Sequence, residues 1–306
     1  MTTLSDKKPL PPGTKLVGKW NGKSYHLERL LGLGANGQVY LALAGGRSVC
    51  AVKIGLEAAE LQGEANILAS LNILEKQRRP FLLDVDDAVL DGKDVPFYVM
   101  RYIPGSPVKD HLRANGSHWF GVIGYRLLER LAALHEAGWV FGDIKSDNVL
   151  VTDYGQVELV DYGGMTAKGR SIRQFTEIYD RGYWSAGTRI ADPAYDWFAV
   201  AILWLHCFDG KRLTQLSRTL IPQNRHPREL MKLVRSNPRL KPMEAWMDKA
   251  FAGRFLDSRD ACANWRETIR ETHSAKAKAS QVPAWMAGLF AASIVLCATA
   301  AVWLFH

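Results

Sequence analysis

Apolar residues follow a strand-like pattern in the first part of the chain. From Tyr25 to about Met100, short runs of alternating apolar and polar positions are punctuated by glycine, as is typical of β-strands joined by turns. The stretch from Glu57 to Leu74 departs from this pattern, because its apolar residues recur at helical spacing. We therefore expect a small strand-rich unit that carries one helix.

Helical periodicity dominates from about Trp119 onward. Residues 121–135 show it most clearly, and two short β-type runs at 149–151 and 157–160 interrupt it. The sequence contains neither an internal repeat nor a low-complexity segment. The pattern predicts an α+β protein with two lobes, in which a β-rich lobe precedes a larger helical lobe.

The end of the chain is apolar at almost every position. Ala284 to Phe305 comprises 22 residues without a charged side chain, which at about 1.5 Å per residue is long enough to cross a hydrocarbon core of about 30 Å. Trp285 and Trp303 lie near its two ends, where interfacial aromatic residues belong. The pattern predicts a transmembrane helix, and a buried terminal helix is the less favoured alternative because buried helices are seldom apolar on all faces.

The charges around this segment predict its orientation. Four basic residues precede the segment: Arg266, Arg270, Lys276 and Lys278. Only His306 follows it, so the positive-inside rule places the long N-terminal part in the cytoplasm. Residues 271–283 are expected to form a basic linker that either touches anionic lipid headgroups or is simply solvated. The first residues lack an apolar stretch, so we expect no signal peptide.

Composition narrows the class of protein only slightly. The chain has 306 residues, of which 47% are hydrophobic, so it can bury one large core or two modest ones and is not disordered. Its four cysteines are far apart and follow no metal or disulfide spacing, which favours a reducing compartment. The formal charge of +8 comes with no Arg-rich run or interleaved aromatic pattern, so we expect no nucleic-acid partner.

A glycine-rich sequence provides the first candidate chemistry. Gly32, Gly34 and Gly37 would let backbone amides approach phosphate oxygens closely, although the same spacing also opens dinucleotide-binding domains. The following residues distinguish the two, because 39–43 continues as a strand rather than a helix and a later strand supplies Lys53. A glycine-rich hairpin beside a lysine suits a nucleoside triphosphate.

A phosphate-binding lysine needs an anionic partner that fixes its long side chain. Glu57, Glu60 and Glu64 occupy one face of the expected helix. Glu64 is the preferred partner of Lys53, because the residues after it continue with the spacing of a helix that packs inward. Glu57 and Glu60 are expected to be solvated.

The most specific segment is 140–150, together with Asp161, which precedes a tyrosine and a glycine. Phosphoryl transfer to a hydroxyl needs a carboxylate that orients and accepts the proton, and oxygen ligands that hold a metal ion on the phosphates. We expect Asp143 to be that carboxylate, and Asn148 and Asp161 to be the magnesium ligands. Ordinary turn and cap residues are the less favoured interpretation, because the flanking elements agree with the site.

These residues occur in the order found in a known family. From about Tyr25 to Trp265 the chain resembles a eukaryotic-type protein kinase of the kind that bacteria also carry. The matching elements are the glycine-rich loop (Gly32, Gly34, Gly37), the strand lysine (Lys53), its helix partner (Glu64), the catalytic loop (Asp143, Asn148) and the Asp of the Asp-Phe-Gly motif (Asp161). The resemblance implies a bilobal protein-kinase-like fold, with ATP and Mg²⁺ or Mn²⁺ as cofactors and a protein as substrate.

The resemblance also implies where the adenine would bind. Met100 corresponds to the gatekeeper, and the backbone of Arg101 and Ile103 corresponds to the hinge that faces the base. Val39 and Ala51 complete the implied nucleotide contacts.

Three further residues have counterparts in the family. Lys145 stands where Ser/Thr protein kinases place a lysine toward the transferred phosphate. Asp196 is similar to the buried aspartate that braces the catalytic loop, and Arg259 is similar to the late arginine that pins the activation segment.

The chain departs from the family pattern in the catalytic loop and after it. Gly142 replaces the arginine that usually receives an activation-loop phosphate, which argues against control by loop phosphorylation. No Ala-Pro-Glu is present after the catalytic residues, and the corresponding stretch 176–184 has an unfamiliar composition. The hydroxyls of Thr166, Thr176 and Ser185 are interpreted as solvated loop groups.

Two other functions stay open. Gly142-Asp143 with a downstream Asn also resembles the catalytic loop of aminoglycoside and choline kinases. Such an enzyme would phosphorylate a small molecule. A pseudokinase that binds nucleotide and serves as a membrane-bound scaffold would also fit the altered motifs. Lys145 and Asp196 favour a protein kinase over the first, and the complete set of catalytic and metal-binding residues disfavours the second.

The expected protein is therefore an ATP-dependent Ser/Thr protein kinase attached to a membrane lipid bilayer by one helix, with its kinase domain in the cytoplasm. We expect five segments: an N-terminal extension (1–24), a kinase N-lobe (25–103), a kinase C-lobe (104–270), a basic juxtamembrane linker (271–283) and a transmembrane helix (284–305).

Overall fold

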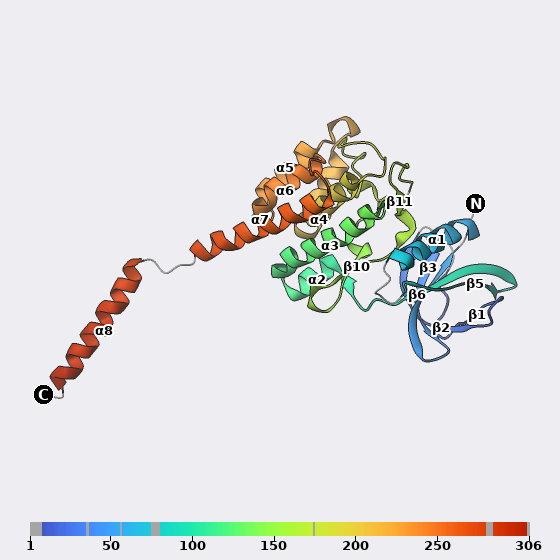
Figure 1. Ribbon diagram of the computed structural model, residues 1–306, viewed down its shortest axis with the longest axis horizontal. Helices are drawn as coiled ribbons and strands as arrows, with labels where there is room; N and C mark the ends of the chain where they lie inside the picture. Colours follow the sequence, from blue (N-terminus) through green and yellow to red (C-terminus); the bar gives the residue numbers. More distant parts are fainter. Residues whose placement is uncertain are drawn as a thin grey trace.

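The structure is a computed structural model. It describes residues 8–34, 37–55, 57–74, 80–173, 175–279 and 284–304. Figure 1 shows two lobes, a sheet with one helix and a larger group of helices, followed by a separate C-terminal helix.

The N-lobe is built on a six-stranded antiparallel sheet with the order β1-β2-β3-β4-β6-β5. Its strands are β1 (Lys15–Val17), β2 (Ser24–Gly34), β3 (Gly37–Ala44), β4 (Ser48–Gly55), β5 (Leu82–Leu90) and β6 (Lys93–Arg101). Alternate residues of the strands, such as Tyr25, Tyr40 and Phe97, pack into one buried cluster because successive side chains point to opposite faces. Helix α1 (Ala58–Leu74) contacts β4, β5 and β6.

The C-lobe packs around one buried helix. Its helices are α2 (Val108–Asn115), α3 (Phe120–Glu136), α4 (Pro193–Thr219), α5 (Pro227–Ser236), α6 (Glu244–Phe251) and α7 (Ser258–Ala279). Every residue of α4 from Tyr195 to Leu205 is buried, as expected for a helix that is apolar on all faces. The rings of Phe120, Trp204 and Trp265 meet edge to face or tilted between α3, α4 and α7, in the geometries that aromatic pairs favour.

Short strands connect the helices of the C-lobe. β7 (Ser106–Pro107), β9 (Val149–Val151) and β10 (Val157–Leu159) form a three-stranded sheet, and β8 (Trp139–Val140) pairs with β11 (Thr166–Ala167). The two β-type runs predicted in this region are β9 and β10, and the predicted helices at 57–74 and 121–135 are α1 and α3. The predicted bilobal order of strands and helices is therefore confirmed.

One predicted structural role is wrong. Among the described residues, Arg259 forms its ion pair with Glu136, with Nε 2.7 Å from Oε1, and not with the activation segment (residues 161–192); its side chain is 80% exposed. The physical reason is its place in the first turn of α7, which packs beside α3, so that its side chain reaches the end of α3.

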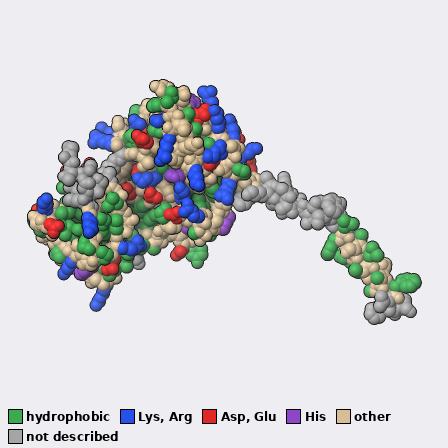
Figure 2. Space-filling view, turned by 180° about the vertical axis from the view of Figure 1, so that it is seen from behind, with side chains coloured by type: hydrophobic (Ala, Val, Ile, Leu, Met, Phe, Trp, Pro, Cys, Tyr) green, Lys and Arg blue, Asp and Glu red, His purple; other side chains and the backbone are tan. Residues whose placement is uncertain are grey.

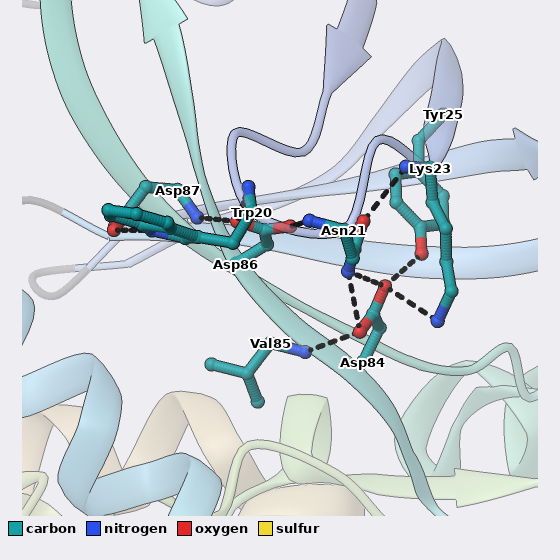
Figure 3. A network of polar contacts seen from close by, with 8 residues as sticks. All are labelled: Trp20, Asn21, Lys23, Tyr25, Asp84, Val85, Asp86 and Asp87. Carbon is teal, nitrogen blue, oxygen red and sulfur yellow. Dashed lines mark hydrogen bonds and ion pairs between the residues drawn. The ribbon is translucent and has the colours of Figure 1, made fainter.

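A polar clasp joins the turn before β2 to strand β5 (Figure 3). The Asp86 carboxylate is 5% exposed and accepts hydrogen bonds from the backbone N–H groups of Trp20 (3.1 Å) and Asn21 (3.0 Å). Asp84 accepts from the Tyr25 hydroxyl at 2.5 Å and from the Asn21 amide. The clasp consists of residues 18–25 and 84–87, and it attaches the start of the N-lobe to the sheet edge.

Helix α8 (Ala284–Leu304) follows the two lobes and extends away from them in Figure 1. Its exposed large apolar side chains are Leu289, Phe290, Ile294, Val295, Leu296 and Trp303, and Figure 2 shows hydrophobic side chains along it. Over the described residues, no helix is both long and apolar enough to cross a membrane. Phe305 and residues 280–283 lie outside the described residues, and the membrane anchor stays a prediction.

Candidate active site

Lys53 lies at the centre of an ion-pair network between the lobes. It comes from β4, is 5% exposed, and its Nζ lies 2.5 Å from Oε2 of Glu64 on α1. The same Nζ lies 3.2 Å from Oδ1 of Asp161, which precedes the short helical turn at 162–164 of the C-lobe. The predicted contact between Lys53 and Glu64 is thus present, and Glu60 is exposed as predicted.

The network keeps Lys53 charged. Burial by itself lowers the pKa of the Lys53 ammonium, but the negative charges of Asp161 and Glu64 outweigh it and raise the pKa above its usual range. Glu64 also accepts a hydrogen bond from the Tyr98 hydroxyl at 3.0 Å. Burial and the carboxylate of Glu64 raise the pKa of Tyr98, so this phenol stays a donor. A cation held in this way can bind an anionic ligand.

The predicted glycine-rich loop is a hairpin between β2 and β3. Gly34 pairs with Gly37, and Gly32 pairs with Val39. Residues 35 and 36 lie outside the described residues. A Cβ at Gly37 would collide with the carbonyl oxygen of Ile54 on β4, whereas one at Gly32 would meet nothing within 4 Å. Gly37 is therefore required by strand packing, and Gly32 leaves open space on which phosphate binding would depend.

The predicted adenine-binding residues lie on neighbouring strands. Ala51 on β4 pairs with Met100 on β6, and both are buried. The chain then leaves the sheet at Arg101, whose N–H donates to the carbonyl oxygen of Phe81 at 2.8 Å and is not free for a ligand. Ile103 is 7% exposed at the start of the connection to the C-lobe. This arrangement brings the predicted set together, and its contact with adenine stays a prediction.

The catalytic loop holds Asp143 in a fixed orientation. Its Oδ2 lies 2.6 Å from Nζ of Lys145. Asn148, which is 3% exposed, donates from its Nδ2 to the backbone oxygen of Asp143 at 2.9 Å and to its Oδ2 at 3.1 Å. Because the amide nitrogen faces Asp143, the amide oxygen of Asn148 is the atom available to a metal ion.

Asp161 and the residue after it connect the catalytic loop to the N-lobe. The backbone of Asp161 is left-handed, with a φ of 60°, a strained conformation that clusters at functional sites. The ring of Tyr162, the next residue, packs between the rings of Phe81 and Phe141, with centroid distances of 5.2 and 5.6 Å. The N–H of Val160 donates to the backbone oxygen of Asn148 at 3.0 Å, which brings the two predicted metal ligands onto adjacent segments.

Asp196 braces the catalytic loop from the buried helix α4. Its carboxylate is 0% exposed and accepts from the backbone N–H groups of Phe141 (2.8 Å) and Gly142 (2.9 Å). His135 of α3 also contacts this carboxylate, with Nε2 2.9 Å from Oδ2. The predicted structural role of Asp196 is confirmed.

Sequence reasoning missed one residue at the site. Thr176, interpreted as a solvated hydroxyl, donates from Oγ1 to Oδ1 of Asp143 at 3.0 Å. Thr166 is not a purely solvated group either, because its hydroxyl donates to the carbonyl oxygen of Gly164. The contact between Thr176 and Asp143 joins segments 33 residues apart, and no local pattern in the sequence signals it.

The donor set fits a nucleotide and a divalent cation. Among the described residues, no cluster of three or more His, Cys, Asp or Glu side chains could hold a metal ion. The carboxylate of Asp161 and the amide oxygen of Asn148 are nevertheless the hard oxygen donors with which Mg²⁺ is bound when nucleotide phosphates supply further ligands. Lys53, held by two carboxylates, would contact the phosphates.

A β-rich lobe and a helical lobe with a buried lysine and a set of carboxylate and amide groups at their junction are typical of the class of kinases. The family model described as protein kinase domain matches residues 25–278. The chain is 37% identical over 250 residues to the serine/threonine-protein kinase YabT of Bacillus subtilis (strain 168), and the match covers 80% of this chain and 72% of that protein. The chain therefore belongs to the protein kinase family, and it is a Ser/Thr protein kinase.

More distant relatives share only part of their length with this chain. It is 26% identical over 223 residues to the serine/threonine-protein kinase PAK 4 of Mus musculus, covering 69% of this chain and 35% of that protein. The solved structure of vaccinia related kinase 3 superposes with a TM-score of 0.60 at 17% identity, covering 89% of this chain and 95% of that chain. That likeness shows the fold alone, and it agrees with the bilobal architecture.

Proposed function

We propose that this chain transfers the γ-phosphate of ATP, in the presence of Mg²⁺ or Mn²⁺, to Ser or Thr hydroxyls of a protein substrate while its C-terminal helix anchors it to a membrane. One observation carries the catalytic part: the network around Lys53 and the network around Asp143 are both assembled. Protein kinases need the lysine–glutamate pair and the metal-binding aspartate in place together.

Each residue then has a defined task. Asp143 orients the substrate hydroxyl and accepts its proton. Lys145, 2.6 Å from Asp143, places a positive charge where the transferred phosphate would pass. Lys53 holds the phosphates, and Asn148 and Asp161 would hold the metal ion. The nucleotide supplies the phosphoryl group when it is bound.

The catalytic proposal is tested with the full-length chain in detergent, labelled ATP and Mg²⁺, and with casein and histone as acceptors. The Asp143→Asn variant should transfer at least about 100-fold more slowly, because a positioned general base contributes roughly 10²- to 10⁴-fold. Asp153→Asn, a matched change at an exposed aspartate of the same lobe, should stay within about twofold of the wild type. Equal transfer by the wild type and Asp143→Asn would refute the proposal.

The same assay separates the alternatives. Labelling of kanamycin or choline without labelling of either protein would indicate a small-molecule kinase. Nucleotide binding without transfer to any acceptor would indicate a pseudokinase.

The membrane part rests on the sequence of the C-terminal segment. Residues 284–305 carry no charge, and basic residues such as Arg266 and Arg270 precede them. In α8 the exposed large apolar side chains would be covered by lipid. Basic residues on the N-terminal side favour a cytoplasmic kinase domain.

Alkaline carbonate extraction of membranes from an expressing bacterial host tests this anchor. The wild type should stay in the membrane pellet, and protease added to inverted vesicles should digest the kinase domain. The double variant Ile294→Arg and Leu296→Arg should move to the supernatant, because each arginine near a bilayer centre costs about 2.5–3.5 kcal/mol. Wild-type protein that is extracted as easily as this variant would disprove the anchor.

A further inference from the structure

The segment between Thr176 and Asp192 connects the catalytic carboxylate to the core of the C-lobe. At one end the hydroxyl of Thr176 donates to Asp143. At the other end Asp192 caps helix α4, because its carboxylate accepts from the backbone N–H of Tyr195 at 3.1 Å. Four residues later α4 supplies Asp196, the brace of the catalytic loop. A displacement of this segment would therefore affect the catalytic loop in two ways, through the contact of Thr176 with Asp143 and through Asp196 of α4.

A buried carboxylate organises the first half of the segment. Asp180 is 0% exposed and accepts hydrogen bonds from the backbone N–H groups of Gly182 and Tyr183, each at 3.0 Å. The Tyr195 hydroxyl donates to it at 3.0 Å, and Nη2 of Arg189 lies 2.7 Å from its Oδ2. The guanidinium of Arg189 also covers the ring of Phe175 at 4.5 Å.

A buried guanidinium organises the second half. Arg181 is 7% exposed and forms a two-point ion pair with Asp192, with distances of 2.8 and 2.6 Å. It also donates to the carbonyl oxygens of Thr188 (2.6 Å) and Ile190 (3.0 Å). The pairs Asp180–Arg189 and Arg181–Asp192 interleave in sequence order, because the first partner of the second pair lies between the two partners of the first. We call these four residues the crossed ion pairs.

The segment has further attachments where the family's Ala-Pro-Glu is missing. Trp184 is 0% exposed and donates from its indole nitrogen to the carbonyl oxygen of Ile178 at 2.9 Å. The Tyr183 hydroxyl donates to the carbonyl oxygen of Ser217 on α4 at 2.9 Å, and the guanidinium of Arg225 lies 3.9 Å from its ring. The Tyr183 hydrogen bond joins the segment to α4, and none of these contacts needs a phosphate.

The catalytic loop offers no arginine that could bind a phosphate on the segment. The residue before Asp143 is Gly142, and its backbone is left-handed with a φ of 81°. A Cβ there would lie 2.6 Å from the carbonyl oxygen of Gly164, so the position excludes a longer side chain. Order in the segment therefore rests on contacts that need no phosphate, among them the crossed ion pairs.

We propose that Asp180, Arg181, Arg189 and Asp192 are positioning residues, whose crossed ion pairs hold Thr176 against Asp143 and order the face that receives the protein substrate without phosphorylation of the segment. The inference rests on the proposed kinase activity. The four residues act through Thr176 and the backbone rather than on the reacting atoms.

The first test compares Arg189→Gln with Arg170→Gln in the full-length chain. Both arginines are exposed residues of the same region, and Arg189 belongs to the crossed ion pairs. Arg189→Gln should lower kcat/KM for casein or histone by at least tenfold, while the dissociation constant for a fluorescent ATP analogue stays within about twofold. Arg170→Gln should match the wild type in both measurements.

Conservative variants separate positioning from folding. Asp180→Asn nearly keeps the side-chain volume but removes the negative charge that faces Arg189. Arg181→Lys keeps the positive charge but loses the two-point contact with Asp192. In both variants transfer to protein should fall while nucleotide binding persists. A purely structural role would instead lower nucleotide binding and the thermal unfolding temperature in parallel with transfer. That parallel loss, or wild-type transfer by Arg189→Gln, would overturn the inference.

The second test concerns phosphorylation. Phosphatase-treated wild type, shown by intact mass to carry no phosphate, should phosphorylate the acceptor without a lag and at a rate within about twofold of untreated enzyme. A lag that ends as the enzyme phosphorylates itself, or a tenfold lower initial rate, would contradict the proposal. Failure of untreated wild type to phosphorylate any acceptor would refute the kinase activity instead, so the two failures are distinguishable.

Discussion

Gly142 shows how one residue can reveal a constraint that its type alone does not. In the sequence it stands where the family has an arginine, which argues against regulation by activation-loop phosphorylation. In the fold its left-handed backbone and its proximity to Gly164 require glycine. The missing arginine is therefore a consequence of how closely two segments of the active site approach each other.

This requirement predicts the effect of a single methyl group. Gly142→Ala should destabilise the protein by at least about 2 kcal/mol, because strain at positive φ and a clash with a carbonyl oxygen add up. Gly138→Ala is a matched control, since Gly138 has a φ of 87° and open space around it; it should cost about 1 kcal/mol. Each kcal/mol of destabilisation lowers the unfolding temperature by roughly 2–4 °C, so thermal unfolding of the full-length chain distinguishes the two variants. Equal decreases in unfolding temperature would contradict the predicted clash.

The clasp between residues 18–25 and 84–87 is the clearest case at the scale of elements. Strand β1 contributes few residues to the sheet edge, so its attachment depends on side chains of β5. Burial alone raises the pKa of Asp84, but hydrogen bonds from Tyr25, Lys23 and Asn21 and the charge of Lys23 outweigh it and lower the pKa below its usual range. A carboxylate whose pKa is lowered in the folded state stabilises that state above the unfolded pKa and loses this effect as pH falls through the folded pKa.

Asp84→Asn should therefore destabilise the protein at pH 7. Its deficit relative to the wild type should begin to shrink below about pH 4, where the unfolded wild type binds a proton at this carboxylate, and should shrink further as the pH falls towards the lowered pKa of the folded state. The difference in unfolding temperature between the two proteins, followed from pH 7 to pH 3.5, measures this. Asp94→Asn removes only an exposed ion pair with Lys19 and should change stability by less than about 1 kcal/mol. A deficit of Asp84→Asn that is independent of pH would argue against a charged role for Asp84.

At the scale of the whole molecule, Lys53 connects the two lobes. Its ammonium contacts Glu64 of the N-lobe helix and Asp161 of the C-lobe, so the position of α1 and the position of the aspartate proposed to bind the metal ion are coupled. The proposed nucleotide site therefore depends on contacts from both lobes.

Replacing Glu64 should weaken catalysis without abolishing the fold. Glu64→Gln removes one charge-assisted hydrogen bond, worth about 1.5–3 kcal/mol, and should lower kcat/KM for ATP by roughly 10- to 100-fold. Glu60→Gln, one turn away and exposed, should have no effect larger than about twofold. Steady-state kinetics with varied ATP measures both, and similar values for the two variants would exclude a role for the ion pair.

Much of the active site could be predicted because its groups carry local signatures. Lys53 lies in an apolar strand, Asp143 and Asn148 share one loop, and Asp161 follows a short hairpin. Thr176 and Arg181 could not be predicted, since their partners depend on how the activation segment folds back on the C-lobe. Arg259 was assigned a partner by resemblance, and the packing of α7 beside α3 gave it another one.

The amino-acid sequence by itself determined the order of lobes and the set of candidate catalytic residues, because periodicity and motif spacing are properties of neighbouring positions. It also carried the apolar segment 284–305, from which a membrane anchor is proposed. Only the tertiary structure decided that Glu64 is the glutamate paired with Lys53, that Thr176 contacts Asp143, and that opposite charges cross within the activation segment. Such pairings join residues distant in the chain, and close packing selects one of several chemically equivalent partners.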